Sequence, residues 1–221
     1  HSIYVSQRHK LLHADIVAKG VASHIPSPHA RALDYGCGEA PGAKHVAERC
    51  GPLFLYDAAP SVRAKLVAST VALPNAKVLD EAGVQDLPEK SLDMIAIVSV
   101  LQYVSGAELA RMLDTFHDKL ADDGLLVLGD IVPNDLSPIE DARALLSFGF
   151  HGGFLTAAAA GLVRTALSDY RTLRAAYGLS TYDEPEMRAL LADHGFACVR
   201  APENIGHNQK RMTFVARKAQ A

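Results

Sequence analysis

The sequence predicts an α/β fold built on a doubly wound, mostly parallel sheet. Short apolar runs alternate with helical stretches over residues 30–130, which is the pattern of parallel strands joined by right-handed crossover helices. One apolar run ends at Asp34 and is followed by Gly36 and Gly38, and the next run ends at Asp57. A strand, a glycine turn and a helix together form a nucleotide-binding loop, so this fold class includes an expected ligand site.

The individual elements follow from apolar periodicity and from helix-breaking residues. An amphipathic helix is expected over residues 5–25, ending before Pro26. A strand ending at Asp34 is followed by strands at 53–57, 76–79, 93–99 and 125–130, and by helices at 41–50, 60–70 and 105–120. Ser105 and Glu108 have the spacing of a capping box. Gly51 is placed to end the second helix in a left-handed conformation.

The apolar face expected of the first helix consists of large aliphatic residues in helical register: Leu11, Leu12, Ile16, Val17, Val21 and Ile25. At the other end of the chain, a helix over 184–194 is closed by Gly195. Strands at 198–201 and 212–217 then form a terminal hairpin. We expect residues 1–221 to form one domain, with residues 1–28 as an N-terminal helical segment.

Residues 134–178 interrupt the alternation and are expected to form a helical cap insertion after the fifth strand. Residues 144–163 within it carry no Asp, Glu, Lys or Arg. We expect two buried helices, broken at His151-Gly152-Gly153, that cover the sheet. Phe150 and Phe154 would then line the acceptor pocket. Peripheral membrane contact and a homodimer interface are the alternatives for this stretch.

Composition narrows the function classes. The chain has 221 residues, of which 49% are hydrophobic and 21% charged, and a net charge of −3. This balance gives no electrostatic reason to bind nucleic acid. The three cysteines, Cys37, Cys50 and Cys198, show no metal spacing and fit a reducing compartment. We therefore expect a cytoplasmic protein without a transmembrane span or a metal.

The glycine turn and Asp57 form the expected ligand site. A carboxylate at the tip of the second strand can accept hydrogen bonds from both hydroxyls of a ribose. The separation of Gly36 and Asp57 fits both a nicotinamide dinucleotide and S-adenosylmethionine. A dinucleotide fingerprint has a third glycine where this chain has Pro41. That difference disfavours the dinucleotide.

The same residues resemble the motifs of class I S-adenosylmethionine-dependent methyltransferases, in particular small-molecule enzymes of the type 11 kind. Residues 32–42 resemble the family's apolar run followed by D-x-G-x-G. Residues 85–88, 91–95, 101–104 and 121–128 resemble its later segments, in the family's order. The resemblance covers nearly the whole chain except roughly residues 134–178. It implies a seven-stranded Rossmann-like sheet with an antiparallel last strand. It also implies S-adenosylmethionine as cofactor and S-adenosylhomocysteine as product.

The resemblance also implies which residues hold this cofactor. Its amino-acid part would be held by Asp34, Gly36, Cys37 and Gly38, and its ribose by Asp57 with Ala58 beside it. Counting back from Leu87-Pro88 places the adenine contact at Gly83 and Val84, whereas counting from the strand end places it at Asp80. Val98 and Ser99 would flank the methyl group.

The catalytic residues are less well defined. Candidate general bases are Asp130 at the end of the fifth strand, Tyr103 after the fourth, His151 in the insertion and His207 in the hairpin turn. A histidine is the natural base near neutral pH. After the fourth strand the family's DNA-adenine and protein-glutamine enzymes have an Asn/Asp-Pro-Pro-aromatic run. Residues 98–101 read Val-Ser-Val-Leu instead.

The leading hypothesis is therefore methyl transfer to an oxygen or nitrogen atom of a small, lipophilic acceptor. Two other functions stay open at this point. One is an NAD-dependent oxidoreductase. The other is a non-catalytic methyltransferase-like binding subunit.

Overall fold

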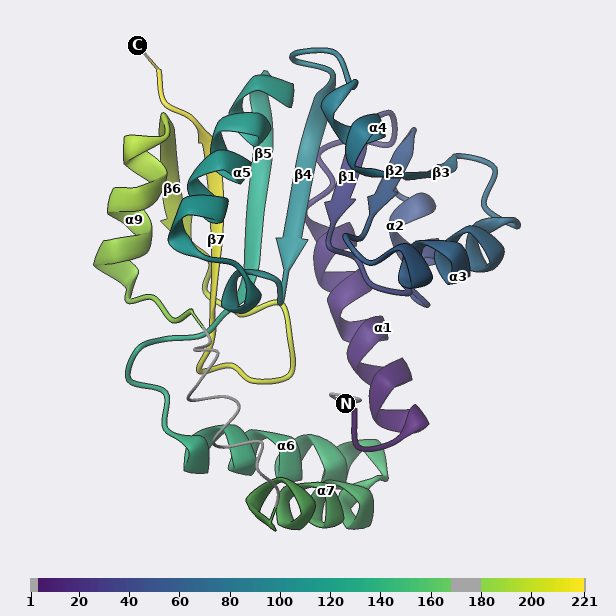
Figure 1. The fold of residues 1–221 in the computed structure, drawn as a ribbon, viewed down its shortest axis with the longest axis vertical. Coiled ribbons are helices and arrows are strands. Elements are labelled where there is room, and N and C mark those ends of the chain that lie inside the picture. Colours follow the sequence, from purple (N-terminus) through teal and green to yellow (C-terminus); the bar gives the residue numbers. More distant parts are fainter. Residues whose placement is uncertain (1–3, 168–179, 221) are drawn as a thin grey trace.

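The computed structural model describes residues 4–167 and 180–220 and is built around one seven-stranded sheet. The strand order is β3-β2-β1-β4-β5-β7-β6 (Figure 1). The strands are β1 (Ala32–Tyr35), β2 (Leu53–Tyr56), β3 (Ala76–Leu79), β4 (Leu92–Val98), β5 (Leu120–Ile131), β6 (Phe196–Arg200) and β7 (Met212–Lys218). Strands β1 to β5 pair in parallel, and β7 is antiparallel to both β5 and β6. The predicted fold class is confirmed, including the antiparallel last strand.

Helices cover both faces of this sheet. They are α1 (Gln7–Ser23), α2 (Ala43–Ala47), α3 (Pro60–Thr70), α4 (Glu81–Gln85), α5 (Gly106–Lys119), α6 (Pro138–Gly152), α7 (Leu155–Leu167) and α9 (Glu184–Asp193), with a 3-10 turn η1 (Leu101–Tyr103) after β4. Helices α4, α5 and α9 contribute to the core on one face, and α1, α2 and α3 to the core on the other. Strand β4 is buried on both faces, as the central strand of a parallel sheet is.

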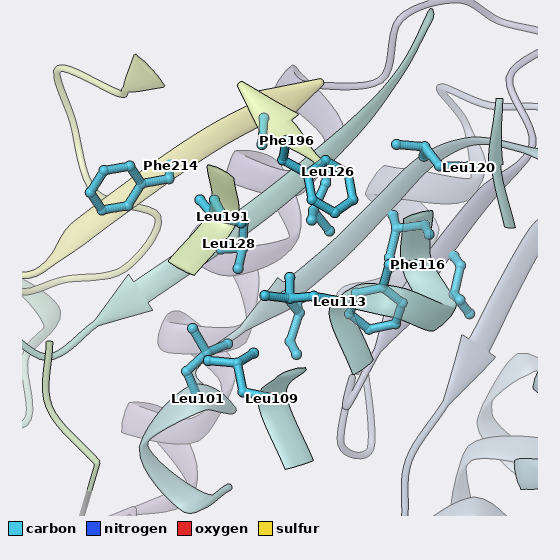
Figure 2. Packing of buried hydrophobic residues seen from close by; sticks show 14 of the residues in the cluster. Leu101, Leu109, Leu113, Phe116, Leu120, Leu126, Leu128, Leu191, Phe196 and Phe214 are labelled. Carbon is cyan, nitrogen blue, oxygen red and sulfur yellow. The ribbon is translucent and has the colours of Figure 1, made fainter. Parts of the chain in front are cut away.

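Helix α5 shows how the larger core is assembled. Its buried side chains Leu109, Leu113 and Phe116 recur at helical spacing and pack against Leu126 and Leu128 of β5 (Figure 2). The helix starts at the predicted capping box, in which Ser105 and Glu108 each bond the other's backbone N–H. Local capping and apolar periodicity therefore agree with the tertiary packing.

Helix α1 differs from its prediction. Its buried residues are His9, Ala18, Val21 and Ala22, whereas Leu11 is 49% exposed. Of the expected stripe, Val21 is buried and Val17 and Ile25 pack partly buried against the same core, but the buried face also contains the small residues Ala18 and Ala22. The reason is a close approach to α2, because a Cβ on Gly42 would lie 2.6 Å from the Cβ of Ala18. Only small side chains fit at that crossing.

Helix α2 is also shorter than predicted, and Gly51 does not close it. The helix ends at Ala47 with Glu48 as a right-handed C-cap, and Gly51 does not have a positive φ. A Cβ on Gly51 would lie 2.8 Å from the carbonyl oxygen of His29. Glycine is needed there for a close backbone approach. Gly195, by contrast, has a φ of +77° just after α9.

Helices α6 and α7 form a hairpin beyond the carboxyl edge of the sheet, beside the start of α1 (Figure 1). They separate at the predicted break, where Gly153 is a left-handed C-cap. The prediction that both helices are buried is wrong, because Phe150 is 69% exposed and Leu155 and Val163 are exposed too. Their small inner residues pack on one another instead: a Cβ on Gly149 would lie 3.0 Å from the Cβ of Ala158.

The predicted insertion continues to residue 178, and its part from 168 onwards lies outside the described residues. Among the helices that the structure does describe, none has the length and apolar character needed to span a membrane.

Candidate active site

A cavity of about 1080 Å³ opens at the carboxyl ends of β1, β2 and β4. Ten residues predicted from the sequence line it: Asp34, Gly36, Cys37, Gly38, Asp57, Ala58, Val84, Val98, Ser99 and Tyr103. Gly83, Asp130, His151 and His207 do not line it. The sheet therefore brings nine of the ten predicted cofactor residues, but only one of the four candidate bases, to one cavity.

The glycine turn after β1 forms one wall. Gly36 and Gly38 have φ values of +75° and +62°. The backbone N–H groups of Gly36 and Cys37 donate to the carbonyl oxygen of Tyr56 at 2.7 and 3.0 Å. A Cβ on Gly36 would lie 2.4 Å from Val100 Cγ2, whereas a Cβ on Gly38 would meet nothing within 4 Å. Only the first glycine is required by both the backbone conformation and the space around it.

Asp57 lies opposite this turn at the end of β2. Its Oδ2 accepts from the backbone N–H of Gly38 at 3.1 Å, and its Oδ1 accepts from the N–H of Ala59 at 2.9 Å. These two bonds fix the carboxylate across the mouth of the glycine turn. Because each carboxylate oxygen has a second lone pair, both can still accept a bond from a ligand hydroxyl.

The floor of the cavity contains two ionisable groups whose charged forms are disfavoured. Burial raises the pKa of Asp34 to about 7. Burial, and then the nearby charges of Asp34 and Asp57, also raise the pKa of the Cys37 thiol. Cys37 is therefore a thiol and not a nucleophilic thiolate. The Asp34 carboxylate accepts no hydrogen bond from any residue in the described part of the chain, so it is available to a cationic ligand group.

The wall after β3 contains only some of the residues predicted for the adenine contact. Val84 lines the cavity but Gly83 does not, and Asp80 instead caps α4 by accepting from the N–H of Gly83 at 2.8 Å. The acidic residue that does line the cavity is Glu81. Sequence reasoning missed it because both ways of counting passed over the residue after Asp80.

Ser99 and Asp130, at the ends of β4 and β5, are held in an unusual conformation. Both have positive φ values, +60° and +59°, which are uncommon outside glycine. Ser99 Oγ donates to Asp130 Oδ2 at 2.7 Å, and Arg211 Nη1 donates to the same oxygen at 2.8 Å. Asn204 Nδ2 donates to Asp130 Oδ1 at 3.1 Å. Both oxygens of the Asp130 carboxylate are therefore occupied by internal donors.

A cluster of three histidines lies next to this network. His207 Nδ1 is 3.4 Å from His13 Nδ1, and the His9 and His13 ring centroids are 6.2 Å apart. His207 stacks on Phe148 at 4.8 Å and His9 stacks on Phe154 at 5.1 Å. Burial lowers the pKa of His9 and of His207 to about 4. No group of metal-ligating side chains in the described ranges has the arrangement that a metal ion needs.

Of these histidines only His13 lines the cavity, together with Lys10 of the same helix and with Tyr4. Sequence reasoning missed His13. The available signal was the four-residue spacing of His9 and His13, which puts both on one helix face.

The remaining candidate bases lie apart from this cluster. His151 is on the exposed side of α6, with its Nδ1 2.8 Å from the carbonyl oxygen of Ser147. Tyr103 ends η1, lines the cavity and is 60% exposed. Phe150 and Phe154 do not line the cavity, and neither does any other residue of α6 or α7 within the described range. The described part of the insertion therefore does not meet the expectation that it lines the acceptor pocket.

Comparison with known proteins adds a family match. Residues 4–201 match the family model described as a methyltransferase domain. No curated protein matches the sequence.

Solved structures share the fold at low identity. Magnesium protoporphyrin IX methyltransferase from Synechocystis PCC 6803 with bound SAH has a TM-score of 0.60 and 17% identity, and the match covers 96% of this chain and 84% of that one. A methyltransferase from Mesorhizobium loti described as S-adenosylmethionine-dependent has a TM-score of 0.58 and 16% identity, covering 90% and 96%. The DhpI–SAH complex has a TM-score of 0.60 and 10% identity, covering 94% and 85%. These likenesses show a common fold.

Proposed function

The chain belongs to the methyltransferase domain family, with S-adenosylmethionine as its cofactor, and on that premise we propose that it methylates an oxygen or nitrogen atom of a small, lipophilic acceptor. The observation that carries the proposal is the cavity at the carboxyl edge, in which the Gly36–Gly38 turn faces the Asp57 carboxylate. Open α/β sheets bind their ligands at this edge.

The residues present fit the cofactor. In the proposal, Asp57 accepts the ribose hydroxyls with Ala58 packed beside it. The glycine turn leaves room for the amino-acid part, and the otherwise unbonded carboxylate of Asp34 faces the ammonium group of that part. The cofactor brings a methyl group on a positively charged sulfur, which is already activated for transfer.

The adenine part is assigned to the wall after β3. Val84 supplies apolar contact there, and Glu81 supplies the acidic group that accepts from the exocyclic amine. Gly83 takes no part, because it lies outside the cavity lining. Val98 and Ser99, at the end of β4, lie beside the position of the methyl group.

The acceptor is assigned to the part of the cavity between α1 and the β4–η1 segment. Its apolar lining includes Ala14 and Val17 on one side and Val100 and Val104 on the other, which supports a lipophilic acceptor. The protein's task is to hold the acceptor atom in line with the methyl group and to exclude water. Both tasks depend on the shape of the cavity more than on a large set of catalytic side chains.

Calorimetry with S-adenosylhomocysteine and with NAD tests the proposal. The expected result is heat released with S-adenosylhomocysteine and not with NAD, and an affinity for S-adenosylhomocysteine that is weaker in Asp57→Asn. Asp86→Asn is a suitable control, because Asp86 is a surface carboxylate at the end of α4 and does not line the cavity. Binding of NAD alone would replace methyl transfer by an oxidoreductase function. Binding of the thioether product without turnover of any acceptor would favour a non-catalytic subunit.

A further inference from the structure

We infer that the methyl acceptor is a hydroxyl compound, a phenol or an alcohol, and that His13 on α1 is the general base that removes its proton. The inference rests on the proposed methyl transfer and adds the acceptor class and the base at the same site. His13 lines the cavity, whereas Asp130, His151 and His207 do not. A base must reach the proton that it removes, so the cavity lining is the first criterion.

The hydrogen bonding of His13 leaves one ring nitrogen for the acceptor. Its Nδ1 is 3.4 Å from Nδ1 of His207, and two neutral imidazoles make this contact when one of them donates. With His13 as the donor, its Nε2 carries a lone pair. Within the described residues no protein group bonds to this Nε2. The nitrogen that can accept a proton is therefore the one that the protein leaves unoccupied.

The charges behind His13 suit a base that starts neutral and becomes positive. Burial lowers the pKa of His13, Asp130 raises it and Arg211 lowers it. Arg211 is shared between Asp130 at 2.8 Å and Asp141 at 3.3 Å. The lowered pKa keeps the imidazole neutral before the reaction, and the Asp130 carboxylate favours the imidazolium that forms as the proton is taken.

The titratable and charged groups that face His13 come from α1, the preceding segment, β5 and the loop before β7: Tyr4, His9, Asp130, His207 and Arg211.

His13 and Ser99, which flanks the predicted methyl position, line the same cavity and are connected through Asp130. Asp130, whose charge acts on His13, accepts a bond from Ser99 Oγ, and Ser99 lines the cavity at the end of β4. Other lining groups are less suitable bases. Glu39 is hydrogen-bonded to Lys10, and its pKa is lowered by that bond. Tyr103, the other sequence candidate in the lining, is 60% exposed, whereas proton transfer in this site requires that water be excluded.

In the proposed step, His13 Nε2 takes the proton of the acceptor hydroxyl. A lone pair of the acceptor oxygen forms the new O–C bond with the donor's methyl carbon, and the electron pair of the broken S–C bond stays on sulfur. The donor's positive charge is lost as S-adenosylhomocysteine forms, and one positive charge appears on His13. His13 then releases the proton to solvent.

The test compares His13→Gln with His9→Gln on a series of substituted phenols of decreasing pKa. His9 is a matched control because it is the same residue type one turn away and does not line the cavity. We expect wild-type protein to methylate phenols. His13→Gln should slow turnover of the least acidic phenol about 100-fold or more, the scale of general-base catalysis. The loss should shrink toward phenols that are already ionised at the assay pH, and His9→Gln should show no such trend.

Three readouts separate this inference from the proposed function. Both variants should bind S-adenosylhomocysteine with wild-type affinity by calorimetry. With S-adenosylmethionine at saturation, the wild-type turnover of a weakly acidic phenol should fall at acidic pH as His13 gains a proton, whereas the turnover of a phenol that stays ionised over the same pH range should not fall. This last measurement needs no substitution, so it holds even where His13→Gln is poorly folded.

Several outcomes would overturn the inference. One is an equal loss for every phenol in His13→Gln, and another is an equal loss in His9→Gln. A third is a wild-type protein that binds S-adenosylhomocysteine and methylates amines but no phenol or alcohol. In that third case methyl transfer itself stands. A wild-type protein that binds no S-adenosylhomocysteine removes the proposed function instead.

Discussion

Replacing Gly36 by alanine tests whether the glycine turn is set by both backbone conformation and space. At a φ of +75° an alanine costs about 1–2 kcal/mol relative to glycine. Its Cβ would also lie 2.4 Å from Val100 Cγ2, and such overpacking costs about 1–3 kcal/mol. We therefore expect Gly36→Ala to lower the free energy of unfolding by about 2–5 kcal/mol. For a chain of this size that is a fall in Tm of about 4–20 °C.

Gly38→Ala is the matched control, because the same substitution there meets only the backbone cost. Its φ is +62°, but no atom lies within 4 Å of the added Cβ. The expected loss is about 1–2 kcal/mol. Urea unfolding followed by circular dichroism, without added cofactor, measures both variants free of any ligand contribution.

A second substitution isolates the steric part. Val100→Ala removes the atom that the new Cβ meets, so it should recover about 1–3 kcal/mol in the Gly36→Ala background. In the wild-type background the same change should cost stability. If Gly36→Ala and Gly38→Ala were equally destabilising, or if Val100→Ala had the same effect in both backgrounds, the packing explanation would be refuted.

Four further predictions concern charge. Asp57→Asn should weaken S-adenosylhomocysteine binding about tenfold or more, because a charged acceptor is lost; unchanged calorimetric affinity would contradict its role. Because the pKa of Asp34 is about 7, affinity for the cationic S-adenosylmethionine should rise as the pH increases through that value, and binding should release a proton. Calorimetry in buffers of different ionisation heat measures this release, and Asp34→Asn should remove both effects. The pKa of His9 is about 4 in the folded chain and about 6.5 in the unfolded chain, so the unfolded chain binds the proton first as the pH falls. The stability of the wild type relative to His9→Gln should therefore decline between pH 6.5 and pH 4. A difference in urea midpoints that stays constant over this range would rule this out. Arg211→Met leaves buried Asp130 without its cation and should cost about 3–5 kcal/mol of stability, partly recovered by adding Asp130→Asn.

The sequence predicted those features that short segments determine. The Gly36–Gly38 turn, Asp57 at a strand end and the Ser105–Glu108 capping box each depend on a few adjacent residues, and the structure has all three. The alternation of apolar runs likewise predicted the order of strands and helices. Such signals are local, so one sequence is enough to read them.

The features that were missed depend on segments far apart in the chain. His13 meets His207 across 194 positions, and Asp130 meets Asn204 across 74, so no local pattern indicates either contact. The exposure of Phe150 was missed for a related reason. Apolar periodicity identifies a face that prefers burial, but it does not identify what covers that face.

The position of α1 has a practical consequence for handling the protein. Tyr4, Lys10 and His13 all line the cavity, so the N-terminal segment is part of its rim. Strand β7 runs antiparallel to β5 and ends at Lys218, at the opposite edge of the sheet (Figure 1). An affinity tag, fluorophore or immobilisation handle fused at the N-terminus would crowd the entrance. The same addition after Lys218 would leave the entrance clear.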